Sequence, residues 1–289
     1  MKKTMLSFVV AMLFSTPSFA WGWPHRVIGY VAQEHCTPST REVLDRYLDS
    51  PLNNIAMWPD IYRCRLWVPQ DYSDAPDYTF KSWEHAVSVG PDCYPLKESN
   101  RPDGNGAGYG AILGYIERLQ NYKEMTDSAV VVDMTALVHM IGDNHCPGHI
   151  LYSKPDGTWD PMGGGIAGGY GIYTHKFKGR KMTLHAIIDG SEAIHNEFGK
   201  NLDTWKEYLD GRYWESRNEI LSGWVGEWLQ DAAIRSKVIY EWVKPGQDLD
   251  ESFYSDPEHE ALLSYLFAAA SYRLAHIFNT LFDPEYCGL

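Results

Sequence analysis

The sequence predicts a mainly α-helical protein. Several stretches repeat apolar residues with the period of a helix, most clearly 127–145 and 258–282. The run 129–138 is almost entirely apolar and contains neither Gly nor Pro, which favours a long buried helix. Only 170–184, around a Lys-Gly-Arg turn, indicates a β-hairpin. We therefore expect helices to carry the functional residues, with one short hairpin beside them.

The other expected helices follow in chain order. Thr37-Pro38-Ser39 precedes 41–48 as the N-cap and first-turn proline of an amphipathic helix. Helical periodicity also predicts helices over 107–123, 185–199 and about 214–242. The composition, with 44% hydrophobic and 14% aromatic residues, supplies a sizeable core, and no linker, low-complexity tract or internal repeat divides the chain.

The first 20 residues have the features of a secretory signal peptide. A basic start precedes the apolar run 5–14, which is too short to span a bilayer, and Ser18-Phe19-Ala20 fits the small-x-small cleavage rule. Later stretches predict no membrane span, so we expect no stable membrane association. The mature chain is expected to begin at Trp21, to form one domain over 21–289, and to be secreted or periplasmic.

The chain is acidic. Its formal net charge of −13 argues against a basic groove for nucleic acid. This charge does not exclude a nucleotide substrate, because bound divalent cations reverse the field locally.

The stretch from His139 to His149 is the strongest chemical signal. His139 and Asp143 are four residues apart, so a helix places them on one face. Pro147 then ends the helix, and His149 follows just beyond it. Imidazole nitrogens and carboxylate oxygens at this spacing are typical zinc ligands.

The same spacing returns in His185 and Asp189. Taken alone, either pair is more simply a buried His–Asp hydrogen bond on a helix. Two pairs with His149 between them indicate a site for more than one metal ion, and such sites mostly hydrolyse phosphate esters.

Five further residues complete an ordered pattern. His25 follows the expected N-terminal Trp21, Asp60 and Arg63 lie in Trp-Pro-Asp-Ile-Tyr-Arg, and His85 ends Trp-Glu-His. With the motifs above and a closing Arg-Leu-Ala helix, the pattern resembles the zinc-dependent single-strand-specific nucleases of fungi and plants (type I nucleases). These are related to bacterial zinc phospholipase C. The resemblance extends over most of the mature chain.

The resemblance implies a phospholipase C/nuclease-like helical domain with a cleft that holds three zinc ions. It implies three ligand sets: Asp60, His85, His139 and Asp143; His149, His185 and Asp189; and His25, Asp143 and the free amine and carbonyl of Trp21. Asp143 can bridge two ions because it offers two oxygens. Arg63 matches the arginine beside the phosphate, where its planar fork suits two oxygens.

Among the departures from the resembled nucleases, two bear on the reaction and on base recognition. Ser88 stands where they carry an acidic residue that orients the attacking water, and Ala86 stands where fungal members carry an aromatic residue that stacks on the base. We therefore expect slow turnover that Ser88→Asp would raise, and poor discrimination between bases. Phosphate ester chemistry is predicted more firmly than nucleic-acid specificity.

The cysteines and the remaining histidine of the motif leave choices open. The odd number of cysteines, Cys36, Cys64, Cys93, Cys146 and Cys287, leaves at least one unpaired unless it pairs between chains. Cys64–Cys93 is the preferred disulfide, because each lies shortly after a residue expected at the metal site. Cys146 is expected to be inert, and His145 to lie outside the ligand set, although it could replace a ligand.

The sequence thus predicts a secreted, monomeric zinc phosphoesterase. Its expected substrate is single-stranded nucleic acid or a nucleotide, cleaved at phosphodiester or 3′-phosphate bonds with Asp143, Arg63 and Ser88 at the reaction centre. A phospholipase C-like enzyme is the alternative, disfavoured because that family typically has Glu where Asp189 stands. A zinc-binding homologue without catalysis is the other alternative.

Overall fold

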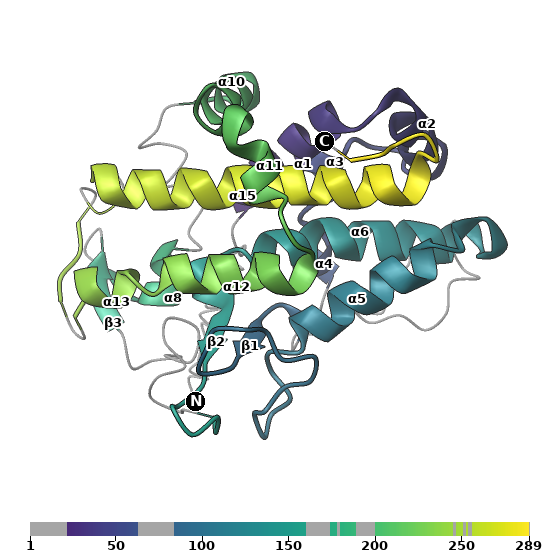
Figure 1. The fold of residues 1–289 in the computed structure, drawn as a ribbon. Helices are drawn as coiled ribbons and strands as arrows, with labels where there is room; N and C mark the ends of the chain where they lie inside the picture. Colours follow the sequence, from purple (N-terminus) through teal and green to yellow (C-terminus); the bar gives the residue numbers. More distant parts are fainter. Residues whose placement is uncertain are drawn as a thin grey trace, which may run out of the picture.

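The protein is mainly helical, as the sequence predicts (Figure 1). The computed structural model describes residues 22–62, 84–159, 174–177, 180–188, 200–244, 247–250, 253 and 256–288. Its α-helices are α1 (Gly22–His35), α2 (Pro38–Tyr47), α3 (Leu52–Ile55), α4 (Trp58–Tyr62), α5 (Gly108–Leu119), α6 (Asp127–Asp143), α8 (Leu184–Ile188), α10 (Leu202–Tyr213), α11 (Arg217–Ile220), α12 (Val225–Ser236), α13 (Ile239–Trp242) and α15 (Pro257–Phe282). Short 3-10 helices are η3 (Tyr122–Glu124), η4 (Pro147–His149) and η5 (Trp214–Ser216).

Helix α15 forms the centre of the fold, with α1, α6, α10 and α12 packed around it (Figure 1). It is the described helix that is long and apolar enough to cross a membrane, yet 83% of its apolar window is buried inside the protein, as in a core helix. Helix α1 lies along it and also approaches α3 closely. A Cβ atom on Gly29 would lie 2.9 Å from the Leu52 carbonyl carbon, so this contact requires glycine.

Helix α6 is buried nearly all round. The Thr126 side chain caps it by accepting a hydrogen bond from the Ala129 amide, and all its residues from Val130 to Asp143 are buried. Helix α5 packs alongside α6, and the Arg118 guanidinium joins the two by donating to both oxygens of Asp133 at 2.7 and 2.8 Å.

The strands within the described residues form two small pairs. β1 (Val87–Val89) pairs in parallel with β2 (Ile150–Tyr152), and β3 (Thr174–Phe177) pairs antiparallel with β4 (Arg180–Thr183). The second pair confirms the expected hairpin within 170–184. The first pair was not predicted, and it brings together the segments that follow His85 and His149.

Two expectations for the fold require correction. The stretch 214–242 is not one helix, because Gly223 in the left-handed region (φ 84°) and an extended Trp224 separate α11 from α12. Cys93 is free and buried in the turn after β1, so the expected disulfide with Cys64 is not formed in the structure. Cys64, the expected signal peptide 1–20 and the segment 189–199 lie outside the described residues.

Candidate metal centre

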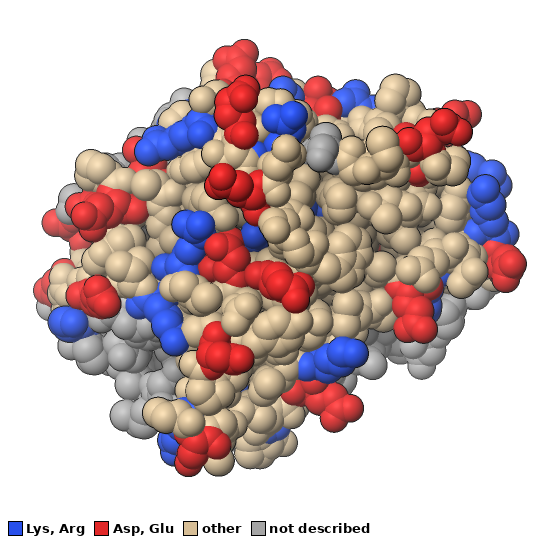
Figure 2. All heavy atoms as spheres, viewed as in Figure 1, with Lys and Arg blue, Asp and Glu red and all other residues tan. Residues whose placement is uncertain are grey.

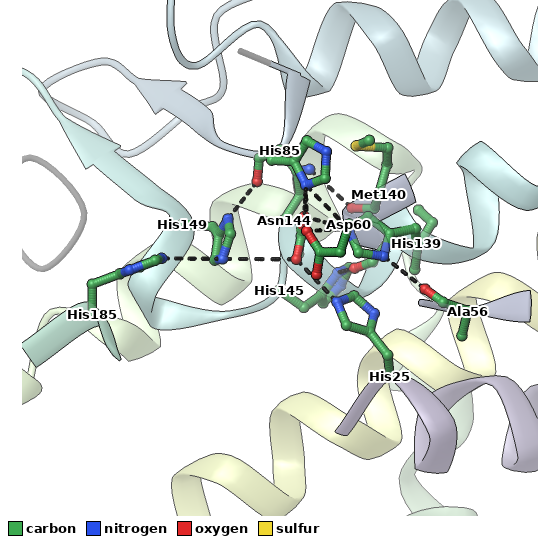
Figure 3. A network of polar contacts seen from close by, with 12 residues as sticks. His25, Ala56, Asp60, His85, His139, Met140, Asn144, His145, His149 and His185 are labelled. Atoms are coloured by element: carbon green, nitrogen blue, oxygen red, sulfur yellow. Dashed lines mark hydrogen bonds and ion pairs between the residues drawn. The ribbon is translucent and has the colours of Figure 1, made fainter. Parts of the chain in front are cut away.

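Several histidines lie close together beside Asp60 (Figure 3). The carboxylate of Asp143 lies within 3.7 Å of four of these imidazoles. One oxygen, Oδ1, is 3.0 Å from His25 Nε2 and 3.7 Å from His149 Nε2. The other, Oδ2, is 2.7 Å from His85 Nδ1 and 3.0 Å from His139 Nε2. Each oxygen of Asp143 thus faces a different pair of imidazoles, and the residue is fully buried. This is the geometry that a bridging carboxylate needs.

Asp60 completes one side of the cluster. Its Oδ1 lies 3.5 Å from His85 Nδ1 and 3.7 Å from His139 Nε2, and its side chain is 4% exposed. Within the described residues, Asp60, His85 and His139 form one group whose ligand atoms lie within 4.8 Å of one another. His25, His139 and Asp143 form a second such group.

His185 extends the cluster from α8. Its Nε2 lies 3.3 Å from His149 Nε2, and His139 Nε2 lies 3.1 Å from His85 Nδ1. Two nitrogens bound at about 2.0–2.1 Å to one tetrahedral zinc ion would be about 3.3 Å apart. Each imidazole pair therefore has the spacing expected of two ligands of one ion, with a separate ion for each pair.

Backbone carbonyls orient two of these rings. His139 Nδ1 donates to the Ala56 carbonyl at 2.7 Å, and His149 Nδ1 donates to the His85 carbonyl at 2.6 Å. With Nδ1 protonated, the lone pair of each neutral ring lies on Nε2, which faces the cluster. Histidine ligands of metals are usually oriented in this way by their second nitrogen.

The electrostatics of the cluster also fit a cation. Burial raises the pKa of Asp143, but the charges of His139 and His149 outweigh burial and hold it well below its ordinary value. Burial likewise disfavours protonated His139, yet Asp143 and Asp60 raise its pKa to about 9. Two buried carboxylates thus draw positive charge into the core, and a divalent cation would supply it without protonated imidazoles.

The structure brings together seven of the expected metal ligands: His25, Asp60, His85, His139, Asp143, His149 and His185. The other two, Trp21 and Asp189, lie outside the described residues, as does Arg63. His145 does not replace a ligand. It is fully buried, and its Nε2 accepts a hydrogen bond from Arg273 Nη1 at 3.0 Å.

The surroundings of Ser88 and Ala86 change one expectation. Ser88 is fully buried on β1, and its hydroxyl donates to the Asn105 carbonyl at 3.5 Å. A Cβ on Gly106 would lie only 2.1 Å from that hydroxyl oxygen, so the space beside it is tight. The Ser88→Asp substitution would therefore force a carboxylate against a carbonyl, a cost that the sequence does not reveal. Ala86 is buried next to Leu151.

Sequence reasoning missed the need for a small residue at position 142. A Cβ on Gly142 would lie 2.4 Å from His25 Nδ1 and 2.6 Å from its Cε1. The glycine that precedes Asp143 on α6 therefore makes room for the His25 ring. Its place directly before a candidate ligand was the available signal.

Comparisons with known proteins agree with this geometry. The chain is 22% identical to Endonuclease 4 of Arabidopsis thaliana over 280 residues, which cover 89% of this chain and 86% of that protein. Residues 21–283 match the family model described as S1/P1 Nuclease, a range that contains every described residue of the cluster. The chain belongs to the S1/P1 nuclease family.

Proposed function

We propose that this protein is a secreted zinc-dependent phosphoesterase of nuclease type, which hydrolyses phosphodiester or 3′-phosphate bonds in single-stranded nucleic acid or nucleotides. The observation that carries the proposal is the buried Asp143 carboxylate, whose two oxygens face imidazoles from α1, η4, the segment before β1, and α6 itself. Membership of the S1/P1 nuclease family supports the substrate class.

The described residues would supply a full ligand set for one zinc ion and part of the set for each of two others. Asp60, His85, His139 and Asp143 supply one set, His149 and His185 belong to another, and His25 with Asp143 belongs to the last. Bound zinc would lower the pKa of water and neutralise charge on the phosphoryl group. Arg63 is proposed to bind the phosphate oxygens, and Asp189 and the Trp21 amine to complete the ligand sets.

The surface charge also bears on the substrate. Figure 2 shows acidic and basic side chains interspersed on the face that carries α12 and α15. With a net charge of −13, long-range attraction would not draw a polynucleotide to the chain. The metal centre itself therefore has to provide the attraction for phosphate, which favours short single strands or nucleotides as substrates. We also propose that the protein acts as a monomer.

The proposal is tested by assaying the purified mature protein, with and without zinc, against single-stranded DNA, RNA, 3′-nucleotides and phospholipid. Zinc-dependent cleavage of nucleic acid or nucleotides is expected. Cleavage of phospholipid alone would favour a phospholipase C-like enzyme, and retained zinc without turnover would indicate a binding protein.

A matched pair of variants shows whether the activity resides in the cluster. Asp143→Asn should abolish it, whereas Asp210→Asn should not. Asp210 also contacts a histidine, His35, at 2.9 Å, but that pair joins α10 to α1 elsewhere in the fold. Equal activity of the two variants would refute the proposed centre.

A further inference from the structure

Arg273 on α15 carries a guanidinium group that is 2% exposed, deep in the core. Its Nε donates to the Ile220 carbonyl at 3.0 Å, and its Nη1 donates to the Trp228 carbonyl at 3.2 Å. Its Nη2 donates to Asp231 Oδ2 at 2.9 Å. The side chain thus joins α15 to α11 and α12, and Asp231 compensates its charge.

Arg273 makes one more contact, which reaches the turn after α6. Its Nη1 also donates to His145 Nε2 at 3.0 Å, while His145 Nδ1 lies 2.7 Å from the Ile141 carbonyl. Arginine is only a donor, so His145 Nε2 must carry the lone pair and Nδ1 the hydrogen. These two partners fix the ring in one tautomer and one orientation.

His145 lies in the turn that connects two candidate ligands, Asp143 and His149. In this turn the His145 amide donates to the Gly142 carbonyl at 3.0 Å, and the Cys146 amide donates to the Asp143 carbonyl at 2.9 Å. The His149 amide in turn donates to the Cys146 carbonyl at 2.9 Å. A shift of His145 would therefore move the backbone on both sides of it, with one ligand at each end.

We propose that Arg273 is a positioning residue for the metal centre, which acts through His145 to hold Asp143 and His149 in place. The inference rests on the proposed function, since it assumes that these ligands bind zinc. A buried ion pair is weak evidence for a role in stability, because well-packed apolar residues of similar volume often replace the whole pair without loss. What Arg273 adds is one fixed geometry of the turn.

The test replaces both partners together, in the variant His145→Leu/Arg273→Met. Asp231 would keep the Arg235 Nε at 2.7 Å and the Tyr265 hydroxyl at 2.8 Å, so no carboxylate is stranded. We expect a folded protein whose zinc affinity falls about 10–100-fold, the usual effect of losing a group that orients ligands. The visible absorption spectrum of the cobalt-substituted protein should change as well, because it reports ligand geometry.

Asn279→Leu is the matched control on the same helix. Asn279 is 2% exposed and joins α15 to the Thr37 amide and the His35 carbonyl, at 2.9 and 3.1 Å. Its loss should lower the melting temperature and leave zinc affinity and the cobalt spectrum unchanged. An equal loss of zinc affinity in this control and in the double variant would overturn the proposal.

Two further outcomes separate the positioning role from the proposed function. A wild-type protein that binds no zinc overturns both, whereas a wild type and a double variant that bind zinc equally overturn the positioning role alone.

If the double variant does not fold, the variant Arg273→Lys tests the positioning role instead. A lysine keeps the charge beside Asp231 but cannot span four acceptors. Weaker zinc binding by Arg273→Lys supports the proposal, and unchanged binding overturns it.

Discussion

Replacing Gly142 by alanine would place a methyl group against the ring of His25. The added Cβ would lie 2.4 Å from His25 Nδ1 and 2.6 Å from Cε1, where an ordinary contact is about 3.5 Å. The ring must then move by about 1 Å inside the protein, where it is 1% exposed and interiors are closely packed. Its 3.0 Å contact with Asp143 would lengthen correspondingly.

The consequences are measurable in two ways. A displacement of about 1 Å at a catalytic centre can lower activity about 100-fold, and overpacking a core costs about 1–3 kcal/mol. Gly142→Ala should therefore lose zinc, most of its cleavage of single-stranded DNA, and thermal stability. Elemental analysis, a cleavage assay and thermal melting report these three quantities.

Gly211→Ala is the control for the same substitution in a helix. A Cβ on Gly211 in α10 would meet nothing within 4 Å, so alanine should raise stability by about 0.5–1 kcal/mol through its better helix propensity. Zinc content and activity should stay as in the wild type. If Gly142→Ala behaves like Gly211→Ala in all three measurements, the packing of His25 against α6 does not position a ligand.

Three other predictions concern the same centre. Asp143→Asn should abolish activity and lower zinc content more than Asp60→Asn, because both oxygens of Asp143 face imidazoles of the cluster; equal losses in elemental analysis would contradict a bridging role. An extra Met or Gly before Trp21 should remove one zinc ion and most activity without changing the fold, because an amide nitrogen is a poor ligand; unchanged zinc content and turnover would show that Trp21 is not a ligand. In the zinc-free protein, Asp143 and Asp60 raise the pKa of His139 to about 9, although burial opposes this. Protonated His139 therefore stabilises the folded protein below pH 6.5, and this stabilisation is lost as the pH rises through 9. Denaturant unfolding in the presence of a chelator should then show a loss of about 3 kcal/mol in the free energy of unfolding over that range, at about 1.4 kcal/mol per pH unit. Added zinc should stabilise the protein more as the pH rises, because its ligands must be deprotonated. A free energy of unfolding that does not change with pH in the absence of zinc would contradict the assignment.

The sequence predicted the helices whose burial leaves a clear pattern. Helix α6 has a Thr cap and an apolar run, and α15 begins after an Asp cap and continues with apolar residues for most of its length. Helix α10 escaped prediction because only Trp205 and Leu209 among its residues are buried, too few for an apolar stripe. The β1–β2 pair also escaped, since each strand has three residues and their partners are far apart in sequence.

In the candidate site, too, local sequence predicts some of the contacts and not others. The spacing of His139 and Asp143 on one helix predicts their proximity directly, because a helix places residues four apart on one face. The motif order further indicated His25, Asp60 and His85, but only through resemblance to a known family. The contact between His145 and Arg273 joins residues 128 positions apart through the packing of α6 on α15, and local sequence carries no signal for it.

The central claim is that a buried cluster centred on Asp143 holds zinc for phosphate ester hydrolysis. Elemental analysis of the mature protein, purified without chelators and assayed in parallel on single-stranded DNA, tests it most directly. We predict up to three zinc ions per chain, with activity that disappears on chelation and returns when zinc is added. Less than one zinc ion per chain, with no gain in metal content or activity on adding zinc, would contradict the account.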